Sequence, residues 1–138
     1  MATHFKDIGA ALSARLSTLP DLPDVSWQNR AFTPTTGVLF LRETLLPGEV
    51  VQSELGESGR DVTTGVYQVD VFAPIGNGKG AAIDQVDAIA DHFARSTVLT
   101  YNSINVRLLG TSLGASAFDG AWWIVPVNIR YQSYLAPR

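Results

Sequence analysis

Residues 62–93, VTTGVYQVDVFAPIGNGKGAAIDQVDAIADHF, change from a strand pattern to a helix pattern within one short stretch. In the first part, apolar residues alternate with polar Gln68 and Asp70, which is typical of a strand in a sheet with one face in water. After the glycines, apolar residues recur every three or four positions, namely Ala82, Val86, Ile89, Ala90 and Phe93. The stretch therefore predicts a long strand over 62–72, a glycine-rich loop and a helix that ends near Arg95.

The part of the chain before this stretch predicts one helix and several strands. A helix is expected over 4–18, because apolar residues share one helical stripe there: Phe5, Ile8, Leu12 and Leu16. The prolines in LPDLPD, residues 19–24, end that helix. Extended segments are then predicted at 25–29, 38–46 and 49–55. The glycine-rich, charged GESGR, residues 56–60, reads as a hairpin tip.

The part after the second helix predicts further strands. A weak strand is expected at 97–101 and a clearer one at 104–109, followed by a flexible connection over 110–120. The last strand, 122–134, alternates apolar residues on one face. Its Pro126 falls on the other face, which favours an edge strand or a bulge because proline cannot donate to a ladder.

This order of elements predicts an α+β fold. Hairpin-length connections favour a mainly antiparallel mixed sheet with two helices packed on one face. The expected hairpin over Glu49–Phe72 is long enough to protrude. We see no repeat or linker, so residues 1–138 are expected to form a single domain.

Composition narrows the class of protein. The 138 residues are 46% hydrophobic and 17% charged, which indicates a globular chain with a core. The absence of cysteine excludes disulfides, thiolate metal sites and a cysteine nucleophile. A net charge of −3 argues against a broad basic face for nucleic acid. Without a long apolar run or a signal-peptide pattern, we expect no membrane span and a cytoplasmic site of synthesis and use.

The glycine loop does not match a phosphate-binding motif. A Walker A loop needs Ser or Thr after Gly78-Lys79, where this chain has Gly80. The dinucleotide fingerprint needs a third glycine where Ala81 stands. We therefore expect a strand-to-helix hinge and no bound cofactor.

Two patterns resemble catalytic or metal sites. Asp84, Asp87, Asp91 and His92 follow one another along the second helix, and their positions suit either a metal face or a solvated helix face, which we favour. GTSLG centres Ser112 in G-x-S-x-G, yet no amphipathic helix follows it and no histidine comes after His92. The sequence therefore predicts neither a metal site nor catalysis.

The adjacent Trp122 and Trp123 must face opposite sides of a strand. One can enter the core, and the other remains on the second face of the sheet. An aromatic there can stack on a base or sugar, or can fill a subunit interface. We favour the interface, because the chain is acidic and has no basic patch. Together with the protruding hairpin, this indicates an assembly protein.

Several stretches resemble one family across almost the whole chain, from Phe5 to Tyr134. They are VSWQNRAFTP (25–34), LFLRETLLPGE (39–49), TGVYQVDVFAPIGNG (64–78), INVRL (104–108) and WWIVPVNIRYQ (122–132). The chain resembles the small tail terminator proteins of tailed phages with long, non-contractile tails. The resemblance implies a mixed sheet with helices on one side and a hexameric ring that caps the tail tube. It also implies that the ring stops tube polymerisation and offers a surface for joining the head. No reaction and no cofactor are expected from the resemblance.

Partners and contact residues follow as expectations. The resemblance implies self-association, contacts with the tail-tube protein and a head–tail joining protein, and DNA passing through the lumen without specific binding. It places the protein in the virion tail, assembled in the bacterial host cytoplasm, from a phage or a prophage. By expected exposure, the candidate assembly contacts are Glu57, Arg60, Asp61, Asn77, Lys79 and Trp122.

Other function classes stay open on the sequence. They are another head–tail connector or tail completion protein, a small ligand-binding α+β module that stacks ligands on Trp122 or Trp123, and a hydrolase centred on Ser112.

Overall fold

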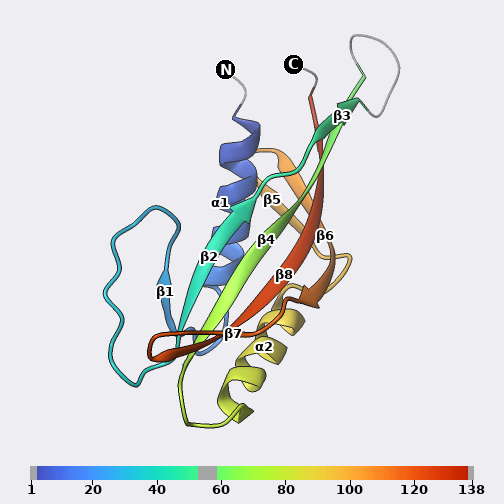
Figure 1. Cartoon of the computed structure of the whole chain (residues 1–138). Coiled ribbons are helices and arrows are strands. Elements are labelled where there is room, and N and C mark those ends of the chain that lie inside the picture. The colour runs from blue at the N-terminus through green and yellow to red at the C-terminus, as the bar shows by residue number, and fades with distance from the viewer. Residues whose placement is uncertain (1–2, 53–58, 137–138) are drawn as a thin grey trace.

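Two helices and eight strands make up residues 3–52 and 59–136, which the computed structural model describes (Figure 1). The helices are α1 (His4–Ser17) and α2 (Gly80–His92). The strands are β1 (Asp24–Ser26), β2 (Phe40–Leu46), β3 (Val50–Gln52), β4 (Asp61–Pro74), β5 (Val98–Tyr101), β6 (Ile104–Leu113), β7 (Ala117–Asp119) and β8 (Trp122–Leu135).

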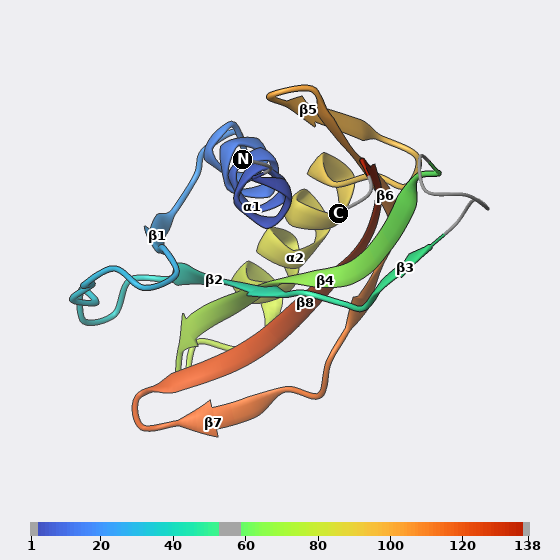
Figure 2. The same ribbon diagram turned by 90° about the horizontal axis from the view of Figure 1, so that it is seen from above.

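All strands join one mixed sheet, which confirms the predicted α+β class. The strand order is β1-β2-β4-β8-β6-β5, with β3 beside β4 and β7 beside β8. Only the β1–β2 pair is parallel among the described pairs. The sheet curls around α1 and α2, which both lie on its inner face (Figure 2). The opposite face, here called the outer face, is covered by neither of the two described helices (Figure 2).

Strands β4 and β8 form the centre of the sheet. They pair along their whole length, from Asp61 opposite Leu135 to Pro74 opposite Trp122. Their inward side chains pack against both helices and alternate with outward ones, as the sequence pattern predicted. The fully buried core includes Ile8, Leu12, Leu16, Leu41, Val69, Val71, Ile89, Phe93, Val106, Leu108, Val127 and Ile129. Burial of this apolar surface is the main force that holds helices and sheet together.

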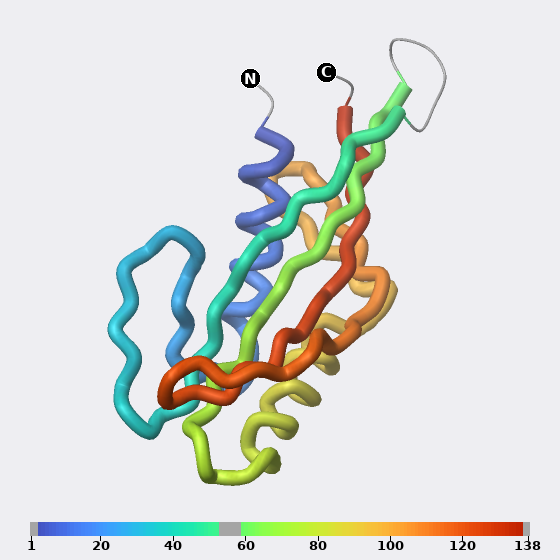
Figure 3. The backbone as a smooth tube through the Cα atoms, in the orientation of Figure 1, coloured from blue at the N-terminus to red at the C-terminus, as the bar shows by residue number. Residues whose placement is uncertain are grey.

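The predicted helices are confirmed, with changes at their ends. In α1, Phe5 is exposed and His4 is buried instead, with its Nε2 3.1 Å from the Ala136 carbonyl oxygen. The start of α1 and the end of β8 therefore lie together at one end of the molecule (Figure 3). Helix α2 ends at His92, before the predicted Arg95. The Arg15 guanidinium donates two hydrogen bonds, of 2.7 and 3.0 Å, to the His92 carbonyl.

The prediction of a flexible connection over 110–120 is wrong. Strand β6 continues to Leu113, because a bulge between Leu108 and Gly110 lets it follow β8 further. Strand β7 then pairs with the start of β8, with Phe118 opposite Trp123. Glycines and serines in this stretch suggested a loop, but backbone pairing to the long β8 strand determines its structure.

The prediction that Pro126 marks an edge strand or a bulge is also wrong. Its strand, β8, is central, and Pro126 lies opposite Asp70 of β4. On its other side, the Pro126 carbonyl accepts a 3.0 Å hydrogen bond from Gly114 N, where β6 ends and β7 has not begun. The N and C=O of one strand residue point to the same neighbour, so the missing N–H faces Gly114 at this interruption and leaves the pairing with β4 intact.

Strands β3 and β4 form the predicted hairpin, with Val51 opposite Val62. Its tip, including Glu57, lies outside the described residues. At the base of the hairpin the chain passes so close to β4 that a Cβ on Gly48 would overlap the Thr64 carbonyl oxygen. Only glycine fits this crossing, which brings the chain from β2 to β3 along the same edge of β4.

Candidate assembly surfaces

The predicted contact residues fall at two ends of the molecule. Arg60 and Asp61 lie where β4 begins, beside the β3–β4 hairpin, and Asn77 and Lys79 lie in the loop between β4 and α2 (Figure 1). Arg60, Asn77 and Lys79 are exposed, whereas Asp61 is half-buried within the sheet. These four residues therefore do not form one site, and of them only Arg60 lines the first hollow described below and only Lys79 lines the second.

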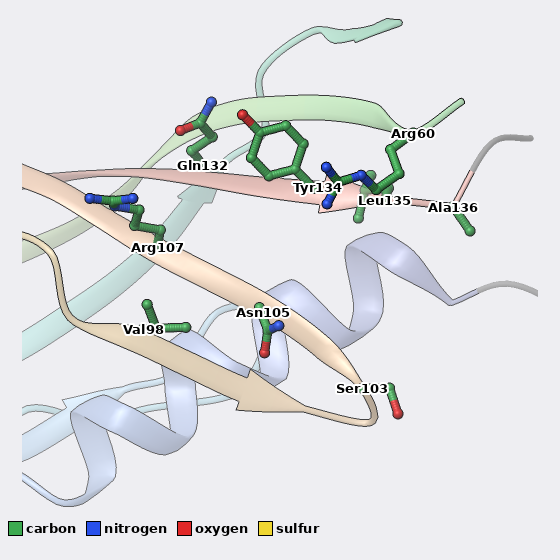
Figure 4. A pocket seen from close by; sticks show the side chains of 9 residues that line it. All are labelled: Arg60, Val98, Ser103, Asn105, Arg107, Gln132, Tyr134, Leu135 and Ala136. Carbon is green, nitrogen blue, oxygen red and sulfur yellow. The ribbon is translucent and has the colours of Figure 1, made fainter. Parts of the chain in front are cut away.

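The first surface is a hollow of about 570 Å³ on the outer face, which we call the arginine hollow (Figure 4). It is lined by Arg60, Val98, Ser103, Asn105, Arg107, Gln132, Tyr134, Leu135 and Ala136. These residues come from the start of β4, the β5–β6 hairpin and the end of β8. Of this set, the sequence predicted only Arg60.

Register explains how the arginine hollow forms. Arg107 of β6 lies opposite Val98 on one side and Gln132 on the other, so the three side chains share the outer face. The Arg60 guanidinium lies over the Tyr134 ring, 4.9 Å from its centre. Two cations thus flank exposed apolar surface, since Val98 is 55% exposed and Tyr134 is 49% exposed. Alternation within INVRL is a signal that could have put Arg107 on the face opposite Val106 and Leu108, but only the strand order shows which side chains lie beside it.

The second surface lies at the other end of the molecule, and we call it the glycine-loop hollow. It is an open depression of about 300 Å³ lined by Pro74, Ile75, Gly76, Gly78, Lys79, Phe118 and Trp123. Gly76 and Gly78 have φ values of +91° and +74°, a left-handed conformation that glycine adopts without strain. The chain can therefore turn sharply from β4 into α2, which confirms the predicted strand-to-helix hinge. Phe118 is 73% exposed beside it, an apolar side chain of the kind that protein interfaces cover.

Trp122 belongs to neither surface. It is half-buried on the outer face, in an aromatic cluster with Phe40 and Phe72. The Phe40 and Phe72 rings stack at 4.5 Å, and Trp122 meets Phe40 edge to face at 4.9 Å. Phe32, from the loop before β2, completes the cluster. Much of the Trp122 side chain therefore contacts residues of the same subunit, so less of its surface is exposed for contact with a partner.

The prediction that Asp70 faces water is wrong. It is 1% exposed, although it lies on the outer face. Its carboxylate accepts hydrogen bonds from the Arg42 guanidinium at 2.8 Å and the Gln68 amide at 2.7 Å. The Arg42 guanidinium also covers the Phe72 ring, 4.8 Å from its centre. This network closes the middle of the outer face, next to the aromatic cluster.

A second buried carboxylate, Glu43, lies between α1 and the sheet. It accepts hydrogen bonds from Ser13 Oγ at 2.7 Å, Tyr67 Oη at 2.6 Å and the Gln28 backbone N–H at 3.1 Å. Burial, together with the Glu43 charge, raises the pKa of the Tyr67 hydroxyl far above its ordinary value. Burial also raises the pKa of the Tyr131 hydroxyl. Donors already occupy both Glu43 oxygens, so this network fixes α1 on the sheet.

The catalytic and metal candidates are not assembled into sites. Ser112 lies in the regular strand β6, opposite Asn128, and not on a strand-to-helix turn. His92 contacts Thr18 and the Arg15 carbonyl at the junction of the two helices. Within residues 3–52 and 59–136, no group of three or more His, Asp or Glu side chains could hold a metal ion. None of the described helices is long and apolar enough to span a membrane.

Comparisons with known proteins support the resemblance noted from the sequence. A family model described as "Phage tail terminator protein" matches residues 7–131. No curated protein matches the chain. Nine chains of solved structures match, and one of them is 28% identical with a TM-score of 0.75. That match covers 99% of this chain and 100% of the other, whose name states no function.

Proposed function

The chain belongs to the phage tail terminator family and is thus a structural phage tail protein, and on that premise we propose that its subunits close into a ring that caps the finished tail tube. The ring, a hexamer in this proposal, stops further addition of tube subunits and provides the surface to which the head is joined. The proposal assigns the chain no catalytic step and no cofactor. Its lumen lets DNA pass without specific binding.

The observation that carries the proposal, beyond the family, is the presence of unlike surfaces on one subunit. A ring forms when one patch of a subunit binds a different patch of its neighbour and the rotation closes. The arginine hollow lies on the outer face, and helix α2 covers the inner one. The two faces are chemically different, which suits head-to-tail contacts around a ring.

The two ends of the molecule suit contacts along the ring axis. The β3–β4 hairpin lies at one end of the molecule, and the loop between β4 and α2 lies at the other (Figure 1). Residues of that loop line the glycine-loop hollow. A ring that ends the tube needs one rim that binds the end of the tube and another rim that does not bind a further tube subunit. We assign tube contact to the glycine-loop hollow, because exposed Phe118 and Ile75 offer apolar surface to an ordered partner.

The proposal is tested by measuring mass and tube length. Light scattering over a concentration series should show a species six times the 14.9 kDa subunit mass, alone or with tail-tube protein. Added protein should shorten tubes that are polymerising from purified tube subunits. A Phe118→Asp variant should keep its ring and lose this effect. If neither a ring forms nor tube length changes, the capping role is wrong and another head–tail joining role should be tested.

A further inference from the structure

The arginine hollow has the chemistry of a protein interface with an acidic partner. Arg60 and Arg107 are both exposed, and no acidic side chain is among the residues that line the hollow. Within the described part of the chain, Arg107 has no ion-pair partner. Arginine and tyrosine are enriched where proteins bind each other, and the arginine fork suits carboxylates. Exposed Val98 and Tyr134 supply the apolar surface between the two cations.

A matching acidic surface lies on the other side of the same molecule. Asp84, Asp87 and Asp91 form a row on helix α2, and all three are exposed. The opposite side of this helix, with Val86 and Ile89, is buried against the sheet. The row therefore faces away from the sheet. Carboxylates at this spacing lie along one helix face, where they repel each other unless cations approach.

We propose that the arginine hollow of one subunit receives the aspartate row of helix α2 from a second copy of this chain. The outer face of one sheet then packs on the helix layer of the next subunit. The contact buries Val98 and Tyr134 and pairs Arg107 with carboxylates. The inference rests on the proposed ring and names its subunit interface.

Charge and placement favour a second copy over other partners. The chain has a net charge of −3, so a nucleic acid would be repelled by the chain as a whole. A small anion would be poorly held, because both arginines are exposed residues and the hollow is open to solvent. The row and the hollow lie on opposite faces of the subunit. Each subunit can therefore engage two neighbours at once, as a closed ring requires.

The inference can be tested by reversing charges and mixing variants. Arg107→Glu and Asp87→Arg should each weaken self-association about tenfold, because each brings like charges together. An equal mixture of the two variants should assemble as well as the wild type. In that mixture every interface can pair opposite charges again, in alternating order around a ring of even number. Light scattering at matched concentration and at two salt concentrations measures the assembly.

Matched controls separate this contact from a general effect of charge. Arg30→Glu and Asp24→Arg reverse exposed charges outside both surfaces and should leave association unchanged. Arg107→Gln and Asp87→Asn provide milder variants if a reversal disturbs folding, which circular dichroism would show. Unchanged association in the reversal variants, or a mixture as weak as its components, overturns the contact while leaving the ring proposal intact. A wild type that never assembles, even with tail-tube protein, overturns both.

Discussion

The inner and outer faces of the sheet are built from alternate residues of the same strands, yet they are covered differently. On the inner face, two helices bury an apolar core that includes Val69 and Val127 at the centre of the sheet. On the outer face, side chains alone do the covering. The aromatic cluster covers the outer face near the end of β4, and the Arg42–Asp70 pair covers its middle. The part of the outer face beside the start of β4 stays open as the arginine hollow.

A period of two therefore does not identify a face of the sheet that is exposed to water. Gln68 and Asp70 looked solvated because they alternate with apolar residues. Asp70 is nevertheless as buried as Tyr67 on the inner face. The outer face is thus part core and part surface. The open part is where an assembling subunit has apolar and charged groups left for a partner.

The largest expected effect comes from breaking the inner face. Ile129 is fully buried, so Ile129→Ala should lower the free energy of unfolding by about 2–5 kcal/mol through lost burial and a cavity. Gln132, on the outer face of the same strand, provides the matched control. Gln132→Ala should change the free energy of unfolding by less than about 0.5 kcal/mol. Urea unfolding followed by tryptophan fluorescence measures both. Equal losses in the two variants would contradict the assignment of faces.

A smaller effect is expected where the outer face is closed. Asp70→Ala removes the carboxylate that Arg42 and Gln68 bind, leaving Gln68 and Arg42 without that acceptor. The loss should be about 1–3 kcal/mol, at the lower end because Arg42 is half-exposed and can turn to water. Asp84→Ala, on the exposed row of α2, should have little effect on stability. If Asp70→Ala changes the free energy of unfolding as little as Asp84→Ala does, Asp70 is exposed to water, as the alternating sequence pattern predicted.

The buried phenols should make stability depend on alkaline pH. The pKa of Tyr67 is raised in the folded state, so above the ordinary tyrosine pKa of 10.0 the unfolded chain loses a proton that the native state keeps. Stability is therefore fully present below pH 10 and falls as pH rises, by up to about 1.4 kcal/mol per pH unit for each such group. Tyr67→Phe should show a shallower fall between pH 9.5 and 11 in urea unfolding. An unchanged slope would mean that Tyr67 ionises in the native state.

The smallest effect is expected at Ser112, which is exposed on β6. Ser112→Ala should leave the free energy of unfolding within about 0.5 kcal/mol and leave assembly unchanged. A serine-reactive probe should label neither the wild type nor the variant. Labelling that disappears in Ser112→Ala would revive the hydrolase hypothesis and would give the open part of the sheet a second role.

From the sequence alone, the two helices, the two long central strands and the class of fold could be predicted. Helical spacing in α1 and α2, and alternation in β4 and β8, predicted the α+β sheet with helices on one face. These patterns are local consequences of 3.6-residue and two-residue periods. Family motifs spread along the chain also indicated the tail terminator family, which the match over residues 7–131 confirms.

Which residues are neighbours in space could be read from the three-dimensional structure but not from the sequence. Pro126 is central because its missing N–H faces the interruption between β6 and β7, which no local pattern reveals. Residues 110–113 and 117–119 form strands because β8 is long enough to pair with both segments. Arg60, Arg107 and Tyr134 are far apart in the chain and share a hollow only through strand register. Burial and pairing of this kind depend on contacts distant in sequence, and these contacts decided the candidate assembly surfaces.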